Sequence, residues 1–414
     1  MFERPPRQSE FLSWSYVVIW SGVVFVTIPF VRDWVKYVRG QWGGEAFTYA
    51  VTAIVILVLV AAVGLLLKLR RKSVASYAWL FGVAGLIVYL TFDLKAGSPE
   101  EAVHFVQYGV LSVLLFRAFT HRVRDYSIYF AAAITGTIVG MIDETIQWLT
   151  PGRYFGLRDI WLNFTAVALV QTALAAGVRP EIVSGWPDGT SLRRSCRLGA
   201  VAVAYLGFCF LNTPDRIAWY TAQLPGLDFI KYNSSIMTEY GYLHGDATTG
   251  LFRSRLDAGE LRRLARDRAE EGGRILERYR NREQYLEFLG IYTPVTDPFL
   301  HEARVHLFRR DTYLDRARRA EEDGERREKL AVAYWENRIL ENYFGELLHA
   351  SSYKWPAALE AEIKANVRTG QIYESRVSHR LITVYSWWQV FWFFLGAVVG
   401  LLFLGAYFGK REPG

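Results

Sequence analysis

Long apolar stretches alternate with short polar ones along most of the chain. Eight stretches reach about 18 residues, the length that a helix needs to cross the apolar core of a bilayer. They are 12–31, 46–67, 77–94, 102–119, 126–149, 159–178, 196–212 and 384–408. A polar stretch from about 213 to 380 separates the last two. The pattern predicts an all-α protein, a polytopic membrane helical bundle of about eight spans with an inserted helical domain.

These changes in polarity predict five parts. Residues 1–74 hold two N-terminal spans, 75–180 a membrane core, 181–212 a loop and the seventh span, 213–380 the inserted domain, and 381–414 the last span.

Helix-start signals recur in the inserted domain: Asp257 with Glu260, Asp297 before Pro298, and Pro356. The first is a capping box and the second an N-cap followed by a proline at the first helical position. Gly272-Gly273 predicts a break after the first helix, and two further helices are expected at about 299–322 and 326–349. Residues 213–256, rich in Asn, Gly, Thr and Tyr, predict a long surface loop or an arm on a partner.

The formal net charge of +7 would suggest a nucleic-acid partner in a soluble protein. Much of the excess stands instead in short loops beside spans, so no nucleic acid is expected. These loops hold Lys68, Arg70, Arg71, Lys72, Arg117, Arg122, Arg124, Arg179, Arg193, Arg194, Arg197, Lys410 and Arg411. The intervening loops are poorer in basic residues, except the one after the first span. The positive-inside rule then predicts an inner-membrane protein with both termini cytoplasmic and residues 213–380 extracytoplasmic.

Three neighbouring apolar segments each carry a polar pair spaced four residues apart. The pairs are His104 with Tyr108, Asp143 with Gln147, and Asp159 with Asn163; Glu144, Arg153 and Arg158 lie beside them. Residues at this spacing share one helix face. Polar groups in membrane helices are costly and turn toward the bundle interior, where they form sites or structural networks. This polar cluster is the candidate functional region.

The same residues resemble a known family. His104-Phe105-x-x-Tyr108, Gly140-x-x-Asp143-Glu144-x-x-Gln147, Pro151-Gly152-Arg153 and Asp159-x-x-x-Asn163 resemble the VanZ-like family of bacterial membrane proteins, over roughly residues 75–180. The resemblance implies a place in the cell envelope and an association with resistance to the glycopeptide antibiotic teicoplanin, without naming a reaction. The family usually has a glycine shortly after the last Asn, whereas this chain has Ala166 and Val167.

Three interpretations of the polar cluster remain open. Arg153 or Arg158 could neutralise the carboxylates in a structural network, because buried charges must be paired. The arginines could instead bind the phosphate or carboxylate of an amphiphile, with aromatic residues such as Trp148 and Trp161 holding its tail. In a catalytic site, His104 would act as a base beside the acidic residues.

Two pairs of small residues mark expected helix contacts. Gly136 and Gly140 would let another helix, which we expect to be the one bearing His104, approach the face of Asp143. Gly396 and Gly400 lie in the aromatic last span, which is either a lipid-facing anchor or a docking helix for another subunit.

No nucleophile elbow, phosphate loop or metal-ligand spacing stands in the sequence, so neither a cofactor nor a metal is expected. We therefore expect a non-catalytic envelope protein that binds a lipid or amphiphile headgroup at the outer membrane interface. The first alternative is a scaffold subunit of a larger, for example energy-transducing, membrane complex. It would meet its partners through the inserted domain and last span. The second alternative is an enzyme acting on envelope lipids.

Overall fold

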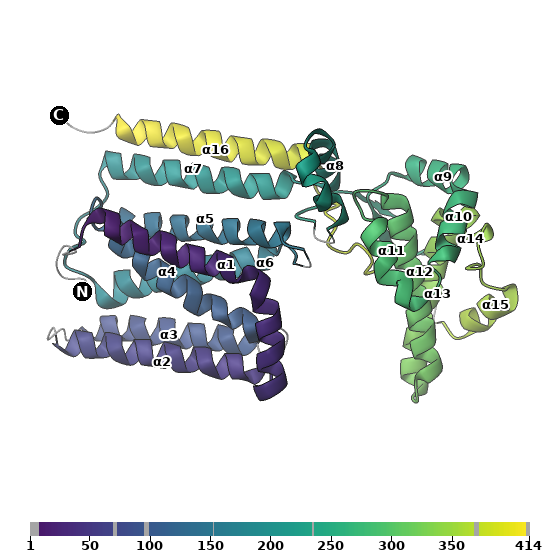
Figure 1. The fold of residues 1–414 in the computed structure, drawn as a ribbon, viewed down its shortest axis with the longest axis horizontal. Coiled ribbons are helices and arrows are strands. Elements are labelled where there is room, and N and C mark those ends of the chain that lie inside the picture. The colour runs from purple at the N-terminus through teal and green to yellow at the C-terminus, as the bar shows by residue number, and fades with distance from the viewer. Residues whose placement is uncertain are drawn as a thin grey trace. The chain divides into compact units, whose positions relative to one another are not determined.

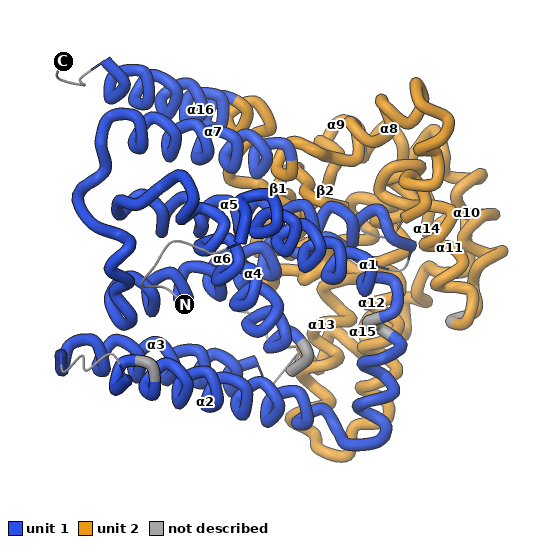
Figure 2. The backbone as a smooth tube through the Cα atoms, turned by 60° about the vertical axis from the view of Figure 1, so that its left-hand side comes forward, with its two compact units in different colours: residues 1–208, 392–414 blue, residues 209–391 orange. Residues whose placement is uncertain are grey.

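A computed structural model describes residues 8–68, 73–94, 99–151, 153–233, 236–367 and 372–410. The chain forms two compact units (Figure 2): Met1–Phe208 with Trp392–Gly414, called unit 1, and Cys209–Phe391, called unit 2. Several residues used in the sequence argument lie outside the described residues: Arg70, Arg71, Lys72, Gly152 and Arg411.

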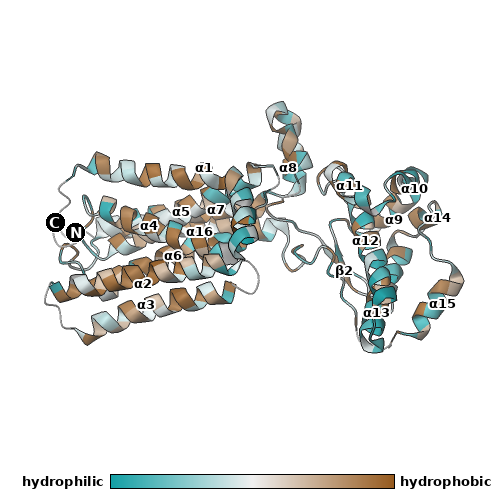
Figure 3. Cartoon of the chain, turned by 60° about the horizontal axis from the view of Figure 1, so that its bottom comes forward, coloured by the Kyte–Doolittle hydropathy of each residue, from teal (hydrophilic) through white to brown (hydrophobic). Residues whose placement is uncertain are grey.

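Unit 1 is a bundle of long helices (Figure 1). They are α1 (Glu10–Trp42), α2 (Glu45–Lys68), α3 (Val74–Leu94), α4 (Val103–Phe119), α5 (Ser127–Leu149) and α6 (Leu157–Thr172), with most of α7 (Gly189–Leu211) and α16 (Trp387–Gly409). A short 3-10 turn, Pro99–Ala102, precedes α4, and a π-helical turn, Ala173–Val178, extends α6. Figure 3 shows apolar residues concentrated on α2 and α3 and hydrophilic residues on the helices of unit 2.

The polytopic all-α fold is confirmed. Among the described residues, six helices are long and apolar enough to cross a membrane: Glu10–Phe30, Glu45–Lys68, Val74–Leu94, Leu157–Val178, Gly189–Leu211 and Trp387–Gly409. Two of the eight expected spans are outside this set. The apolar helix α4 has only 17 residues. Helix α5 has 23, but its acidic, amide and hydroxyl side chains lower its apolarity.

Helix α1 continues past the end of its predicted span. The sequence indicated a loop after residue 31, yet the helix runs on to Trp42. Figures 1 and 2 show it bending sharply partway along, so that its last turns cross the end of the bundle. Pro29 lies inside the helix, in its second half. Proline has no N–H for the helical ladder and clashes with the preceding turn, which accounts for the bend.

Unit 2 is mainly helical. Its helices are α8 (Pro214–Gln223), α9 (Ala258–Asp267), α10 (Ala269–Arg278), α11 (Tyr285–Ile291), α12 (Pro298–Arg319), α13 (Asp323–Tyr343), α14 (Gly345–His349) and α15 (Ala357–Ala365), with 3-10 turns at Pro225–Tyr232 and Arg282–Gln284. A small antiparallel hairpin pairs β1 (Tyr242–His244) with β2 (Phe252–Ser254), with Tyr242 opposite Ser254. Phe252, Phe299, Leu307, Ile339 and Phe344 are among the residues of the core.

The helix-start signals of unit 2 are confirmed. Asp257 and Glu260 form the reciprocal capping box, Asp297 accepts from the backbone N–H of Leu300, and Pro356 is the N-cap of α15. The break predicted at Gly272-Gly273 was wrong, because α9 ends before Arg268 and both glycines lie inside α10. A Cβ on Gly272 would stand 2.5 Å from Leu347 Cδ1. These glycines therefore serve close packing.

The prediction of a loop or arm at 213–256 was also wrong in part, since this segment forms α8, a 3-10 turn and the hairpin. Buried Glu302 of α12 holds the hairpin end: it accepts from Ser254 Oγ at 2.6 Å and from the Arg255 backbone N–H at 2.8 Å. The prediction failed because these partners are about 50 residues away in sequence, where local pattern carries no signal.

A second buried carboxylate holds the segment that leads to the last span. Glu336 of α13 accepts from Tyr373 Oη at 2.6 Å, Ser375 Oγ at 2.7 Å and Arg309 Nε at 2.9 Å, and pairs with His306 Nδ1 at 2.6 Å. Burial alone would raise the pKa of this carboxyl, but His306 and the hydrogen bonds outweigh it and hold the pKa below its usual value. Glu336 thus stays ionised as an anchor.

Candidate functional site

The polar residues of α4, α5 and α6 meet at one end of the bundle, where α4 and α6 begin and α5 ends. Tyr108, Asp143, Glu144, Gln147 and Asn163 are all buried. Helix geometry explains the grouping: the pairs spaced by four residues each turn one face inward, and the short loop 150–156 brings the end of α5 back to the start of α6. The sequence-derived pairs therefore come together.

One chain of hydrogen bonds links the loop to α5. Arg153 Nη2 donates to Gln147 Oε1 at 2.5 Å, and Gln147 Nε2 donates to Glu144 Oε1 at 2.6 Å. The other oxygen of Glu144 accepts from the backbone N–H of Gly156 at 3.0 Å. Both oxygens of Glu144 are thus used, and the carboxylate fixes the turn that begins α6.

A separate contact joins α4 to α5. Tyr108 Oη donates to Asp143 Oδ2 at 2.9 Å. His104 lies one turn before Tyr108, with the two rings stacked at a centroid distance of 6.1 Å. His104 interacts electrostatically with Asp143, and the side chain of Asn163 is close enough to act on His104 as a hydrogen-bonding group. Asp143, Glu144 and Asp159 also lie within one another's electrostatic influence.

Several buried atoms of this group lack a hydrogen-bond partner within the described part of the chain. They are His104 Nδ1, Asp143 Oδ1, Asn163 Nδ2 and Asn163 Oδ1. Buried polar atoms in folded proteins are nearly always hydrogen-bonded, since an unsatisfied one costs roughly 1–3 kcal/mol. Four such atoms stand close together on three neighbouring side chains.

The arginines act on the carboxylates from a distance. Within the described residues, no lysine or arginine lies at ion-pair distance from Asp143 or Glu144. Arg153 donates to an amide, and Arg158 lies 3.4 Å from Glu101 at a solvent-accessible position. The charge of Arg153 nevertheless acts on Asp143, Glu144 and Asp159, and that of Arg158 on Asp159. A structural network therefore stays an open interpretation of the polar cluster.

Glycines bring α5 close to α6. A Cβ on Gly140 would stand 2.9 Å from Asn163 Cβ, and one on Gly136 would stand 2.8 Å from Val167 Cγ2. The glycines themselves contact α6, with Leu115 of α4 next to them. The expected helix, α4, lies against the Asp143 face through Tyr108. The VanZ-like family usually has a glycine close to the position of Val167. Here Gly136 of α5 supplies the small residue on the facing helix, so valine fits on α6.

Sequence reasoning missed a second polar contact between α4 and α6. Buried Gln171 Nε2 donates to the Ser112 carbonyl oxygen at 2.9 Å and to Ser112 Oγ at 2.8 Å, and Ser112 Oγ donates to the Val167 carbonyl oxygen at 3.1 Å. The signal available in the sequence was that Gln171 and Ser112 are polar residues within apolar stretches, which predicts a contact between their helices. Of the two tryptophans named for holding an amphiphile's tail, Trp148 is buried and Trp161 is exposed.

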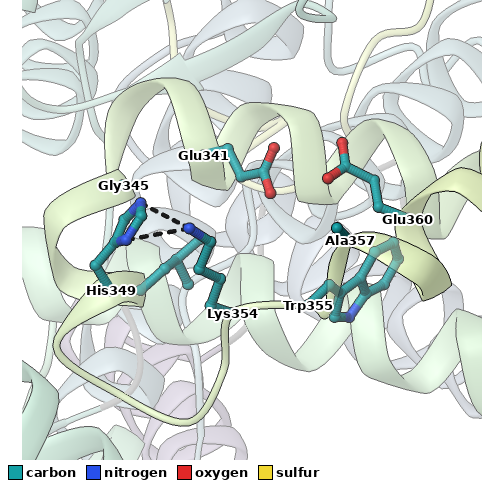
Figure 4. Close-up of a pocket in the computed structure, with 8 residues that line it drawn as sticks. Glu341, Gly345, His349, Lys354, Trp355, Ala357 and Glu360 are labelled. Carbon is teal, nitrogen blue, oxygen red and sulfur yellow. Dashed lines mark hydrogen bonds between the residues drawn. The ribbon is translucent and has the colours of Figure 1, made fainter.

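Unit 2 contains a surface hollow lined by residues of both charges (Figure 4). The carboxylates of Glu341 and Glu360 face a common space, and Lys354 Nζ lies 3.1 Å from His349 Nδ1. Trp355 forms part of its wall. Lys354 and His349 are exposed to solvent, so their interaction is screened and the hollow shows no set of desolvated polar groups comparable with the cluster in unit 1.

Comparison with known protein families finds a match in unit 1. Residues 13–174 match the family model described as VanZ/LLP1. The match begins in α1, so it extends further toward the N-terminus than the resemblance at 75–180 suggested. No curated protein and no solved structure matches the chain. The segment formed by α1 to α6, with the polar cluster inside it, is VanZ-like.

Proposed function

We propose that this VanZ-like membrane protein binds the polar head of an amphiphile in the cluster formed by His104, Asp143 and Asn163. The observation that carries the proposal is the group of four buried polar atoms without partners. A structural network would use these atoms, because each unused one costs free energy. A bound headgroup would satisfy them together and would recover that cost on binding.

The donor and acceptor types constrain the head. Asp143 Oδ1 and Asn163 Oδ1 accept hydrogen bonds and Asn163 Nδ2 donates one. A head with hydroxyl or amine donors therefore fits the inner part of the cluster. Arg153 lies in the loop between α5 and α6, at the edge of the cluster, where its guanidinium could bind a phosphate of the head. A phospholipid or lipid-linked envelope intermediate has this combination, and the cluster lies at the end of the helices, at the depth of bilayer headgroups.

The proposed location is the bacterial inner membrane, with both termini cytoplasmic and residues 213–380 extracytoplasmic. Basic residues such as Arg122 and Arg194, which stand at one set of helix ends, support this orientation. Alkaline phosphatase fused after residue 250 should be active, and the same enzyme fused after residue 125 should be inactive. The opposite activities of the two fusions would show that the topology is inverted.

Asn163→Leu separates binding from structure. Neither amide atom of Asn163 makes a hydrogen bond of regular geometry within the described residues, although its side chain acts on His104. Replacing the amide by an apolar group of similar size should therefore cost little stability. The matched control is Gln171→Leu on the same helix, which breaks two hydrogen bonds to Ser112. It should lower stability while leaving the headgroup site intact.

The measurement is native mass spectrometry of the full-length chain extracted in mild detergent, with a denaturing-detergent titration on the same samples. We expect a phospholipid-sized adduct on the wild type and on Gln171→Leu, and its loss on Asn163→Leu. If Asn163→Leu keeps the adduct but loses stability, the cluster is structural and the proposal fails.

A second candidate function is an accessory subunit of a larger membrane assembly. Helix α16 favours it: Phe394, Leu401 and Gly405 contact α7, whereas Gly396 and Gly400 have nothing within 4 Å of an added Cβ. These two glycines lie on the opposite side of α16, where a partner helix could approach. A particle with fixed additional subunits after extraction, disrupted by Gly396→Leu, would support this candidate. A particle of a single 47.5 kDa chain with bound lipid would contradict it.

A further inference from the structure

The last turns of α1, residues 33–42, form an amphipathic helix after the bend. Trp34, Val38 and Trp42 are spaced by four residues and lie along one side. By 100° rotation per residue, Asp33, Lys36 and Gly40 fall on the opposite side, and Arg39 lies at its edge. At about 1.5 Å per residue, this helix, here called the α1 arm, is roughly 15 Å long.

The direction of the α1 arm differs from that of the spans. Figures 1 and 2 show it running across the end of unit 1, from the end of the first span toward the start of α2. Since the spans run along the membrane normal, a helix that crosses their ends runs along the membrane surface. Val38 is buried against the bundle, whereas Trp34 and Trp42 are 67% and 70% exposed on either side of it.

These observations point to one partner. Tryptophan rings settle at the boundary between acyl chains and headgroups, and the arm is covalently continuous with a membrane span. The side facing away from the tryptophans carries Lys36, whose side chain is 69% exposed and whose Nζ lies 3.6 Å from Asp33 Oδ1; Arg39 lies at the edge of that side. Basic side chains next to a membrane surface attract anionic headgroups. We propose that the α1 arm lies in the membrane interface, with Trp34 and Trp42 in the headgroup boundary, its opposite side toward water, and Lys36 and Arg39 attracting anionic headgroups from that aqueous side.

Lipid-specific fluorescence quenching tests the proposal. The full-length chain without its native cysteines (Cys196→Ser, Cys209→Ala) receives a single labelled cysteine by Trp34→Cys or Gly40→Cys; Gly40 has open space for it. Phe403→Cys, on the exposed side of α16, is the control for a lipid-facing span. Each protein is reconstituted with nitroxide-labelled phosphatidylcholine or nitroxide-labelled phosphatidylglycerol, and iodide serves as the aqueous quencher.

The label at 34 should be quenched by both lipids, with severalfold stronger quenching by phosphatidylglycerol, while the label at 40 is quenched mainly by iodide. Lys36→Gln with Arg39→Gln should remove the preference for phosphatidylglycerol and keep the quenching by phosphatidylcholine. The label at 403 should be quenched equally by the two lipids, with or without the double substitution. Unchanged quenching at 403 shows that the doubly substituted protein is still folded in the membrane. Equal lipid quenching at 34 and 40, iodide quenching at both, or a preference that survives the double substitution would overturn the proposal.

Discussion

Gly140→Ala tests how the site is built. The new Cβ would stand 2.9 Å from Asn163 Cβ and 3.2 Å from Asn163 Nδ2, whereas non-bonded carbon atoms prefer about 3.5–4.0 Å. The helices must therefore separate by roughly 0.6–1 Å by this comparison. Overpacking of this kind costs about 1–3 kcal/mol, and alanine returns up to about 1 kcal/mol of helix propensity. The net expected loss of stability is about 0–2 kcal/mol.

The matched control is Gly82→Ala in α3, where nothing lies within 4 Å of an added Cβ. That change should be neutral or stabilising by up to about 1 kcal/mol, so the two variants should differ by about 1–3 kcal/mol. The assay is hydrogen exchange of peptides from α5 and α6 during a denaturing-detergent titration. Gly140→Ala should also weaken retention of the lipid adduct, since it displaces Asn163. Equal stability of the two variants would refute the packing argument.

Three further predictions concern single groups. Tyr108→Phe removes the donor to Asp143 and should cost about 0.6–1.7 kcal/mol in the same detergent titration; an unchanged midpoint would contradict the contact. In unit 2, burial and then the charge of Arg255 lower the pKa of His301 from 6.5 to about 4, so the unfolded chain takes up this proton first. The free energy of unfolding should therefore fall by up to about 3 kcal/mol as pH drops from about 6.5 to about 4. In His301→Gln, the stability of unit 2 measured by hydrogen exchange should lose that part of its pH dependence. The same dependence of stability on pH in the variant and the wild type would refute the role of His301. Gly273→Ala places a Cβ 2.5 Å from a facing backbone carbonyl oxygen and should lower the thermal stability of unit 2 by about 1–3 kcal/mol; an effect no larger than that of Gly290→Ala, where the space is open, would contradict this.

The spans and the polar cluster could be predicted because their signals are local. A run of apolar residues predicts a membrane helix whatever its neighbours are, and a spacing of four residues places His104 and Tyr108 on one face. The same reasoning found the capping box at Asp257, because its two partners are three residues apart.

The failures came from contacts between distant segments. Gly272 and Gly273 indicated a break, but their lack of side chains serves packing against α14, which no local pattern reveals. The direct acceptor of Arg153 is the amide of Gln147, which the sequence did not reveal because the three-dimensional arrangement of the loop decides which group the guanidinium reaches. The extension of α1 was missed because charged residues after an apolar run also fit a loop.

The most direct test of the account is cryo-electron microscopy of the chain in nanodiscs of its native lipids, viewed at His104, Asp143 and Asn163. The account predicts non-protein density continuous with an acyl chain, within hydrogen-bond distance of Asp143 Oδ1 and the Asn163 amide. Side chains that hydrogen-bond one another there, with no such density, would contradict it.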